Sequence, residues 1–262
     1  MTIDPILEAL TRDADQMAAQ GWCVIRTGAR TREEGLSLLG ALVPACGPVI
    51  PHTENGAFAD VTTADHLNDR STLRPQSDNG PLFPHTDGVL SPQLPGVFAM
   101  LCIESAGTGG ASVLVDVRPF LREHRGSGDL DPLFDDDAVA IVRGPVQTSV
   151  SVLRRRGPFV DVAFSSHEYN TTAPKPACAE AFAALHRFVG DPANHRRVQL
   201  TSGDLILVAN RFCLHGRDAF EDGGRRRHLV RGWYTGPVQG CAAFDGFVPA
   251  DTRFRGGRCR SS

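Results

Sequence analysis

Short apolar segments separated by turns fill most of the chain after residue 96, and they constrain the fold more than any other feature. Strands are predicted at 97–103, 112–115, 138–143, 147–153, 159–164, 205–208 and 229–234, with one helix at 179–189. Many short strands with a few helices packed outside them are typical of an antiparallel sandwich or barrel. We therefore predict a mostly β fold with flanking helices.

The first part of the chain has a different pattern, with helices around one short strand. Residues 5–20 carry apolar side chains at helical spacing, and residues 22–25 form a short apolar run. Thr31 is followed three positions later by Glu34, the pattern of a capping box that begins a second helix. Residues 1–45 are therefore predicted to form a helical support layer.

Residues 50–95 are rich in Pro, Asn, Asp, Thr and Gly and contain few apolar runs. A long irregular stretch inside a compact domain is either disordered or functional. The triplet from His85 to Asp87 lies inside it, which favours an active-site or lid segment. At 262 residues, the chain 1–262 is interpreted as one domain.

Composition excludes several classes of partner. The formal net charge is −3, so no global field attracts nucleic acid or an anionic membrane surface. The seven cysteines include no C-x-x-C pair, which favours reduced thiols and a cytoplasmic location. No signal peptide and no apolar run of membrane-spanning length is recognised.

The spacing of His85 and Asp87 places an imidazole and a carboxylate two residues apart. In an extended segment residues i and i+2 point to the same side, so both side chains can reach one metal ion. A facial triad of two histidines and one carboxylate needs a second histidine and leaves coordination positions open. Without that partner, a surface turn would be the usual interpretation of the pair.

His215 is the candidate for the second histidine, because it follows an apolar strand and precedes two regularly spaced arginines. Arg227 and Arg231 are four residues apart, and an extended chain would turn both inward and His228 outward. Buried guanidinium groups need an acidic partner, and the planar fork of arginine matches a carboxylate. This combination predicts a metal site beside an anion site.

Three blocks of sequence together resemble the taurine dioxygenase and clavaminate synthase superfamily of Fe(II)- and 2-oxoglutarate-dependent dioxygenases. The blocks are residues 82–88 (LFPHTDG), residues 109–112 (GGAS), and residues 210–220 together with 225–229. The resemblance extends over about residues 20–236. It rests on the order and spacing of the blocks, since no single block is specific.

The resemblance implies a double-stranded β-helix (jelly-roll, cupin-like) core. It also implies that His85, Asp87 and His215 hold Fe(II), to which 2-oxoglutarate and O2 bind. Members of the superfamily that halogenate lack the carboxylate of the triad. The presence of Asp87 therefore favours hydroxylation, with desaturation or cyclisation as variants.

The resemblance further assigns residues to the co-substrate. Arg227 would bind the distal carboxylate of 2-oxoglutarate, and Ser112 would assist. Arg226 is a rival for the role of Arg227, because the loop that follows the distal histidine varies in length. Arg231 would contact the co-substrate or an acidic group of the substrate; pairing with an acid on a neighbouring strand is an equal alternative.

The implied activity is oxidation of an unactivated C–H bond in a small metabolite, an amino acid or a related natural-product intermediate, with release of succinate and CO2. A cupin-like metal hydrolase or isomerase and a non-catalytic binding protein are the alternatives. Residues 165–172 form a polar loop that is either solvated or lines the substrate pocket, where Glu168 or Asn170 could meet an amine. A small-molecule substrate is expected, a nucleic-acid or membrane partner is not, and a homo-oligomer is left open.

Overall fold

The computed structural model describes residues 6, 8, 9, 12, 14–51, 56–63, 79–167, 170–224 and 226–236. Its α-helices are α2 (Ala14–Gln20), α3 (Arg32–Ala41), α4 (Val43–Cys46), α5 (Arg118–Glu123) and α6 (Ala179–Gly190). Short 3-10 helices are η2 (Asp131–Phe134), η3 (Pro176–Cys178) and η4 (Pro192–Asn194). Within the described ranges, no helix is both long enough and apolar enough to cross a membrane.

Two antiparallel sheets form the body of the molecule. The larger has five strands in the order β1 (Trp22–Arg26), β13 (Asp204–Ala209), β4 (Val97–Glu104), β16 (His228–Tyr234) and β2 (Phe58–Thr62). The smaller has four strands in the order β12 (Arg196–Val198), β6 (Ser112–Asp116), β14 (Cys213–Arg217) and β3 (Leu82–His85).

Successive strands alternate between these sheets. β3 is followed by β4 and β6, and after an insertion β12, β13, β14 and β16 again alternate between the smaller and the larger sheet. The sheets face each other, since Phe98 on β4 stacks on His215 of β14 with ring centroids 4.1 Å apart. This winding is a jelly roll, and it confirms the predicted mostly β fold.

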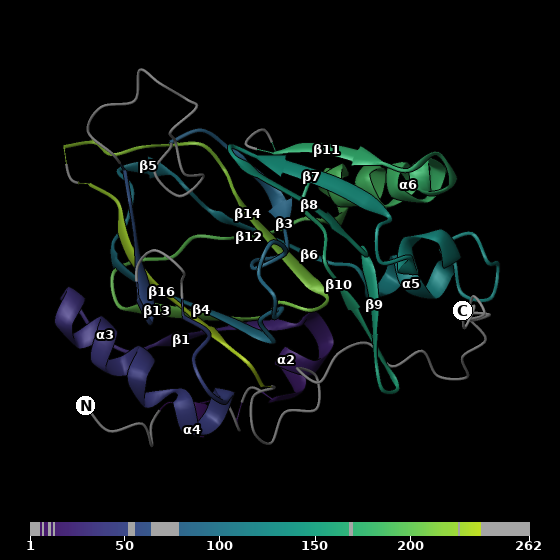
Figure 1. Ribbon diagram of the computed structural model, residues 1–262. Helices are drawn as coiled ribbons and strands as arrows, with labels where there is room; N and C mark the ends of the chain where they lie inside the picture. The colour runs from purple at the N-terminus through teal and green to yellow at the C-terminus, as the bar shows by residue number, and fades with distance from the viewer. Residues whose placement is uncertain are drawn as a thin grey trace.

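The helix α3 covers the outer face of the larger sheet (Figure 1). The helix α4 contacts α3, and α2 contacts the edge strand β1. Gly35 permits close packing, because a Cβ atom there would lie 2.8 Å from Cγ2 of Val230 and 3.0 Å from Cδ2 of Leu101. The hydroxyl of Tyr234 on β16 donates a hydrogen bond of 2.7 Å to the carbonyl of Leu39. The outer side chains of β16 thus anchor this support layer.

The insertion between β6 and β12, which includes α6, lies at the other side of the barrel (Figure 1). It contains a three-stranded sheet in the order β11 (Thr171–Pro174), β7 (Val139–Arg143) and β8 (Val146–Val150). It also contains the hairpin of β9 (Leu153–Arg156) and β10 (Phe159–Val162). A further short pair joins β5 (Thr108–Gly109) to β15 (Phe220–Glu221).

Most elements predicted from the sequence are present, including the capping box of Thr31 and Glu34 at the start of α3. The single strand predicted at 147–153 is wrong, because the chain turns between β8 and β9, where the amide of Val152 donates to the carbonyl of Leu133. The irregular segment predicted at 50–95 was wrong where it holds β2 and β3. Of the helix predicted at 5–20, the continuous described part is α2, and several earlier residues lie outside the described ranges.

Candidate metal centre

The two histidines of the predicted triad are neighbours on adjacent strands. His85, the last residue of β3, is the register partner of His215 on β14, and their ring centroids are 4.9 Å apart. Gly216 makes this approach possible, because a Cβ atom there would collide with the carbonyl oxygen of Leu82 and lie 2.9 Å from the amide nitrogen of Pro84. The His-Gly pair therefore brings β3 close to β14.

Asp87 lies in the turn after β3, where hydrogen bonds from other segments hold the main chain. The amide of Thr86 donates to the carbonyl of Phe164 at 2.7 Å. The buried side chain of Asn210 accepts a hydrogen bond from the Asp87 amide at 2.9 Å and donates to the Asp87 carbonyl at 3.0 Å. This fixes the position from which the Asp87 side chain extends toward the histidines.

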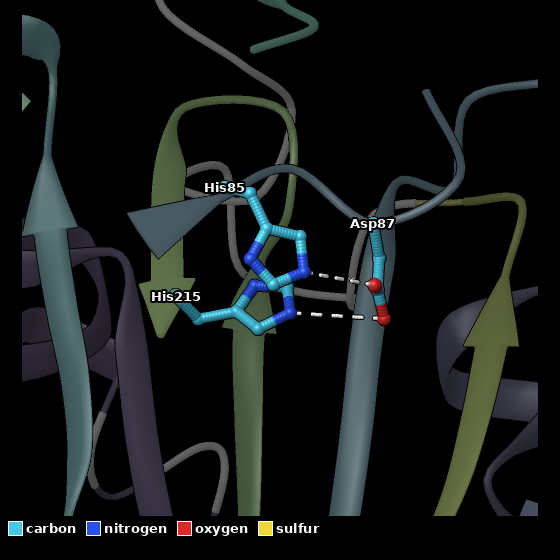
Figure 2. A group of neighbouring side chains, drawn as sticks. All are labelled: His85, Asp87 and His215. Atoms are coloured by element: carbon cyan, nitrogen blue, oxygen red, sulfur yellow. Dashed lines mark ion pairs between the residues drawn. The ribbon is translucent and has the colours of Figure 1, made fainter. Parts of the chain in front are cut away.

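The three side chains converge on one point (Figure 2). Nε2 of His85 is 3.5 Å from Oδ1 of Asp87, and Nε2 of His215 is 3.7 Å from Oδ2. Their candidate ligand atoms all lie within 4.8 Å of one another, and each residue is buried. Two imidazoles and one carboxylate are the donor set of a facial triad, which suits non-haem Fe(II).

The protonation states also fit a metal site. Nδ1 of His85 is 3.0 Å from the carbonyl oxygen of Phe83, so the tautomer that donates there leaves the Nε2 lone pair toward the centre. Burial lowers the pKa of His215. Burial opposes ionisation of Asp87, but the Arg231 guanidinium and the neighbouring imidazoles hold the pKa of that carboxyl well below its usual range. Deprotonated ligands are the forms that bind metal.

Arg231 on β16 contacts the carboxylate of the triad. Nη1 of Arg231 donates to Oδ2 of Asp87 at 3.1 Å, and Nε1 of Trp233 donates to the same oxygen at 2.7 Å. His228 lies on the opposite face of β16, with Nε2 2.9 Å from Oδ1 of Asp60. The alternation predicted for this strand is therefore present. The acid that Arg231 contacts is the triad carboxylate in the turn after β3, whereas the predicted alternatives were the co-substrate, the substrate or an acid on a neighbouring strand.

The other predicted arginine, Arg227, lies immediately before the first residue of β16. Arg227 is buried, whereas Arg226 is exposed. The guanidinium carbon of Arg227 lies 5.2 Å from the ring centroid of Phe220, and that of buried Arg217 lies 4.8 Å from the same ring. Burial, together with the charge of Arg217, lowers the pKa of Arg227 to about 10. No described residue accepts a hydrogen bond from the Arg227 guanidinium.

Ser112 begins β6 and is buried. It is the register partner of Arg217 on β14. His215, two residues before Arg217 on the same strand, pairs with Leu114. Residues two apart on a strand share a face, so Ser112 and Arg217 lie on the same side of the smaller sheet as His215. Gly110 has a φ of 72°, and a Cβ atom added to it would lie 3.6 Å from Nε of Arg227. Ser112 and Arg227 thus border the same end of the barrel.

A third histidine lies against the triad, and it was not predicted as a site residue. The ring of buried His167 meets that of His85 edge-on, with centroids 5.2 Å apart. Burial, followed by the charge of His85, lowers the pKa of His167 to about 3. The amide of Asn170 donates to Oγ of Ser165 at 2.7 Å and lies 3.3 Å from Nε2 of His167. Glu168 of the same loop lies outside the described residues.

Together, a jelly roll and a buried His-Asp-His cluster define a class of mononuclear metal-dependent enzymes. The particular family follows from the sequence: residues 3–233 match the family described as "Taurine catabolism dioxygenase TauD, TfdA family". The chain belongs to this family. The match confirms the predicted family.

Individual relatives are more distant. A trimethyllysine dioxygenase of Meyerozyma guilliermondii is 25% identical over 191 residues, which cover 67% of this chain and 46% of the relative. The chain thus spans about half the length of the curated relative that it matches.

Among solved structures, an asparagine oxygenase bound to Fe(II), 3-hydroxyasparagine and succinate has a TM-score of 0.64 at 18% identity, covering 87% of this chain and 79% of the other. The non-haem iron oxygenase OrfP bound to Fe, succinate and (3S)-hydroxy-L-Arg has a TM-score of 0.64 at 15% identity, covering 87% and 80%. These similarities confirm the jelly-roll fold.

Proposed function

We propose that this chain is an oxygenase that uses Fe(II), 2-oxoglutarate and O2 to hydroxylate an unactivated C–H bond of a small metabolite, with desaturation or cyclisation as variants. Succinate and CO2 are the co-products. The observation that carries the proposal is a buried His-Asp-His cluster in the same barrel as the buried guanidinium of Arg227. A hydrolase or isomerase that used the same triad would have no need of that arginine.

In this proposal, His85, Asp87 and His215 hold the iron. Bound iron supplies the activation of O2, coupled to the oxidative decarboxylation of 2-oxoglutarate. The protein positions the ligands and excludes water, since all three side chains are buried. Because Asp87 occupies the carboxylate position, we assign oxygenation rather than halogenation to the site.

The co-substrate would bind between the triad and the end of the barrel bordered by Phe220. We assign the distal carboxylate of 2-oxoglutarate to Arg227, whose planar guanidinium can donate two parallel hydrogen bonds. Burial favours Arg227 over exposed Arg226 for this role. Ser112 would donate a hydroxyl to the same carboxylate, and Arg217 adds a second positive charge nearby. Low exposure to water strengthens both interactions.

An amino acid, or a related intermediate, is the substrate class that we assign to this site. Oδ1 of Asn170 is buried and has no hydrogen-bond partner in the described part of the chain. A buried acceptor without a partner is costly, so a substrate N–H such as an amino group is its natural partner. Two relatives whose structures contain hydroxylated asparagine or arginine support this class.

The test measures succinate formed from 2-oxoglutarate in the presence of Fe(II), ascorbate and O2, with each common L-amino acid added in turn. We expect one or a few amino acids to stimulate succinate release, and His215→Ala to abolish it. Turnover of a substrate without 2-oxoglutarate would support the hydrolase or isomerase instead. Amino-acid binding without succinate would support a non-catalytic protein.

The role of Asn170 has its own test. Asn170→Ala should raise the KM for the amino acid about tenfold, as expected for the loss of one buried hydrogen bond. The KM for 2-oxoglutarate should stay unchanged. Asn194→Ala is the matched control, since the Asn194 amide donates to the carbonyl of Phe188 in α6. Equal KM values for the amino acid in both variants would show that Asn170 does not bind the substrate.

A further inference from the structure

The two oxygens of the Asp87 carboxylate have different surroundings. Oδ2 accepts hydrogen bonds from Nε1 of Trp233 at 2.7 Å and from Nη1 of Arg231 at 3.1 Å. Each oxygen also lies near one histidine, Oδ1 3.5 Å from Nε2 of His85 and Oδ2 3.7 Å from Nε2 of His215, but only Oδ2 accepts hydrogen bonds from Trp233 and Arg231. A carboxylate oxygen offers about two lone-pair positions, so these two donors occupy those of Oδ2. Oδ1 keeps its lone pairs for a metal ion.

We propose that Trp233 and Arg231 are positioning residues that hold Asp87 as a one-oxygen iron ligand, with Oδ1 bound to the metal and Oδ2 kept away from it. The inference rests on the proposed iron site. A carboxylate that turned both oxygens to the metal would occupy one more coordination position. The hydrogen bonds to Oδ2 thus keep that position open for 2-oxoglutarate or O2.

Asp87 needs such support because it does not lie in a strand. It follows β3 in a turn, and the next residue, Gly88, has a φ of 75°. Asn210 holds the main chain of Asp87, but it does not fix the rotation of the carboxylate about its terminal bond. That torsion is broad for an aspartate side chain. Donors on the facing strand are therefore required to set it.

The strand β16 is suited to provide both donors. Arg231 and Trp233 are two residues apart, so they project from the same face of the strand. The guanidinium carbon of Arg231 lies 5.3 Å from the ring centroid of Trp233, so each side chain also supports the other. Trp233 is the register partner of Phe98, whose ring stacks on His215. One pair of strands therefore orients two of the three metal ligands.

The test compares metal binding by the full chain and by its Trp233→Phe variant, which keeps an aromatic ring and removes the N–H donor. The probe is Co(II), titrated without 2-oxoglutarate and followed by its visible absorption. We expect the dissociation constant to rise about 10- to 100-fold, the usual effect of removing a residue that orients a metal ligand. The Co(II) spectrum should change shape, and the melting temperature of the metal-free protein should change little.

The other tryptophan of the chain provides the matched control. Trp22 is half-buried on β1, and Trp22→Phe should bind Co(II) like the wild type. In an Asp87→Ala background, Trp233→Phe should cause no further loss of affinity, because its effect passes through that carboxylate. The proposal is overturned if Trp233→Phe binds Co(II) within about twofold of the wild type, or if its effect persists without Asp87.

Failure of the proposed function would give a different pattern of Co(II) binding. In that case the wild type and His215→Ala would bind Co(II) equally weakly, and the inference about Trp233 would fall with the metal site. A wild type that binds Co(II) through His215, together with an unaffected Trp233→Phe variant, would overturn the positioning role alone.

Discussion

Gly216→Ala should damage the metal centre without changing any ligand. Gly216 follows His215 on β14, and a Cβ atom there would collide with the carbonyl oxygen of Leu82 and lie 2.9 Å from the amide nitrogen of Pro84. Both obstacles are main-chain atoms of β3, so no side-chain rotation relieves the contact. The strand β3 must move away from β14, and His85 at its end moves with it.

The magnitude follows from the geometry. Forcing one methyl group into a close-packed site costs about 1–3 kcal/mol, and contacts with main chain place this case at the upper end. The register pairing of His215 with His85 would be strained, so the two Nε2 atoms would separate. A small displacement of a ligand weakens metal binding, and we expect an affinity loss of about tenfold or more.

The assay combines urea unfolding of the metal-free protein with Co(II) titration. Gly40→Ala is the matched control, because a Cβ atom at Gly40 in α3 meets nothing within 4 Å. This control should leave Co(II) binding intact and stabilise the helix by up to about 1 kcal/mol. The argument is refuted if Gly216→Ala unfolds at the wild-type urea concentration and binds Co(II) with wild-type affinity.

Three further predictions concern other parts of the molecule. Gly35→Leu should lower the free energy of unfolding by about 2–3 kcal/mol because α3 is pressed against the larger sheet; a midpoint of urea unfolding equal to that of Gly40→Leu would contradict this. Arg227→Ala should raise the KM for 2-oxoglutarate on the order of 100-fold, whereas Arg226→Ala should change it less than about twofold; similar KM values for the two variants would count against the assignment. The pKa of Asp87 is lowered in the folded protein, so its stabilisation is fully present above about pH 4 and is lost as the pH falls further. Unfolding of metal-free Asp87→Asn should therefore depend less on pH than that of the wild type between about pH 4 and pH 2, and identical pH profiles would contradict the sign.

The sequence was sufficient to predict the triad because spacing and context agreed. His85 and Asp87 alone were ambiguous, and the residues around His215 supplied the missing constraint. The alternation along β16 also followed from the sequence, since a strand has a period of two. The same alternation places Trp233 on the face of Arg231, so its inward position could have been inferred.

Partners across the barrel could not be inferred. Whether Arg231 would meet Asp87 or a ligand depends on how the turn after β3 sits against β16, and that is set by tertiary packing. His167 was not predicted as a site residue either, because a polar run after a strand is more often a solvated loop, and only tertiary packing brings it to His85. The strand β2 was not predicted because it is short and its apolar side chains are interrupted by Asp60; pairing with β16 stabilises it.

The most direct test of the metal centre is anomalous X-ray diffraction from crystals grown without oxygen and soaked with Fe(II) and 2-oxoglutarate. The account predicts one strong iron peak within bonding distance of His85, Asp87 and His215, with one oxygen of Asp87 on the metal and the distal carboxylate of the co-substrate on Arg227. An iron peak elsewhere, or none at the triad under saturating Fe(II), would contradict it.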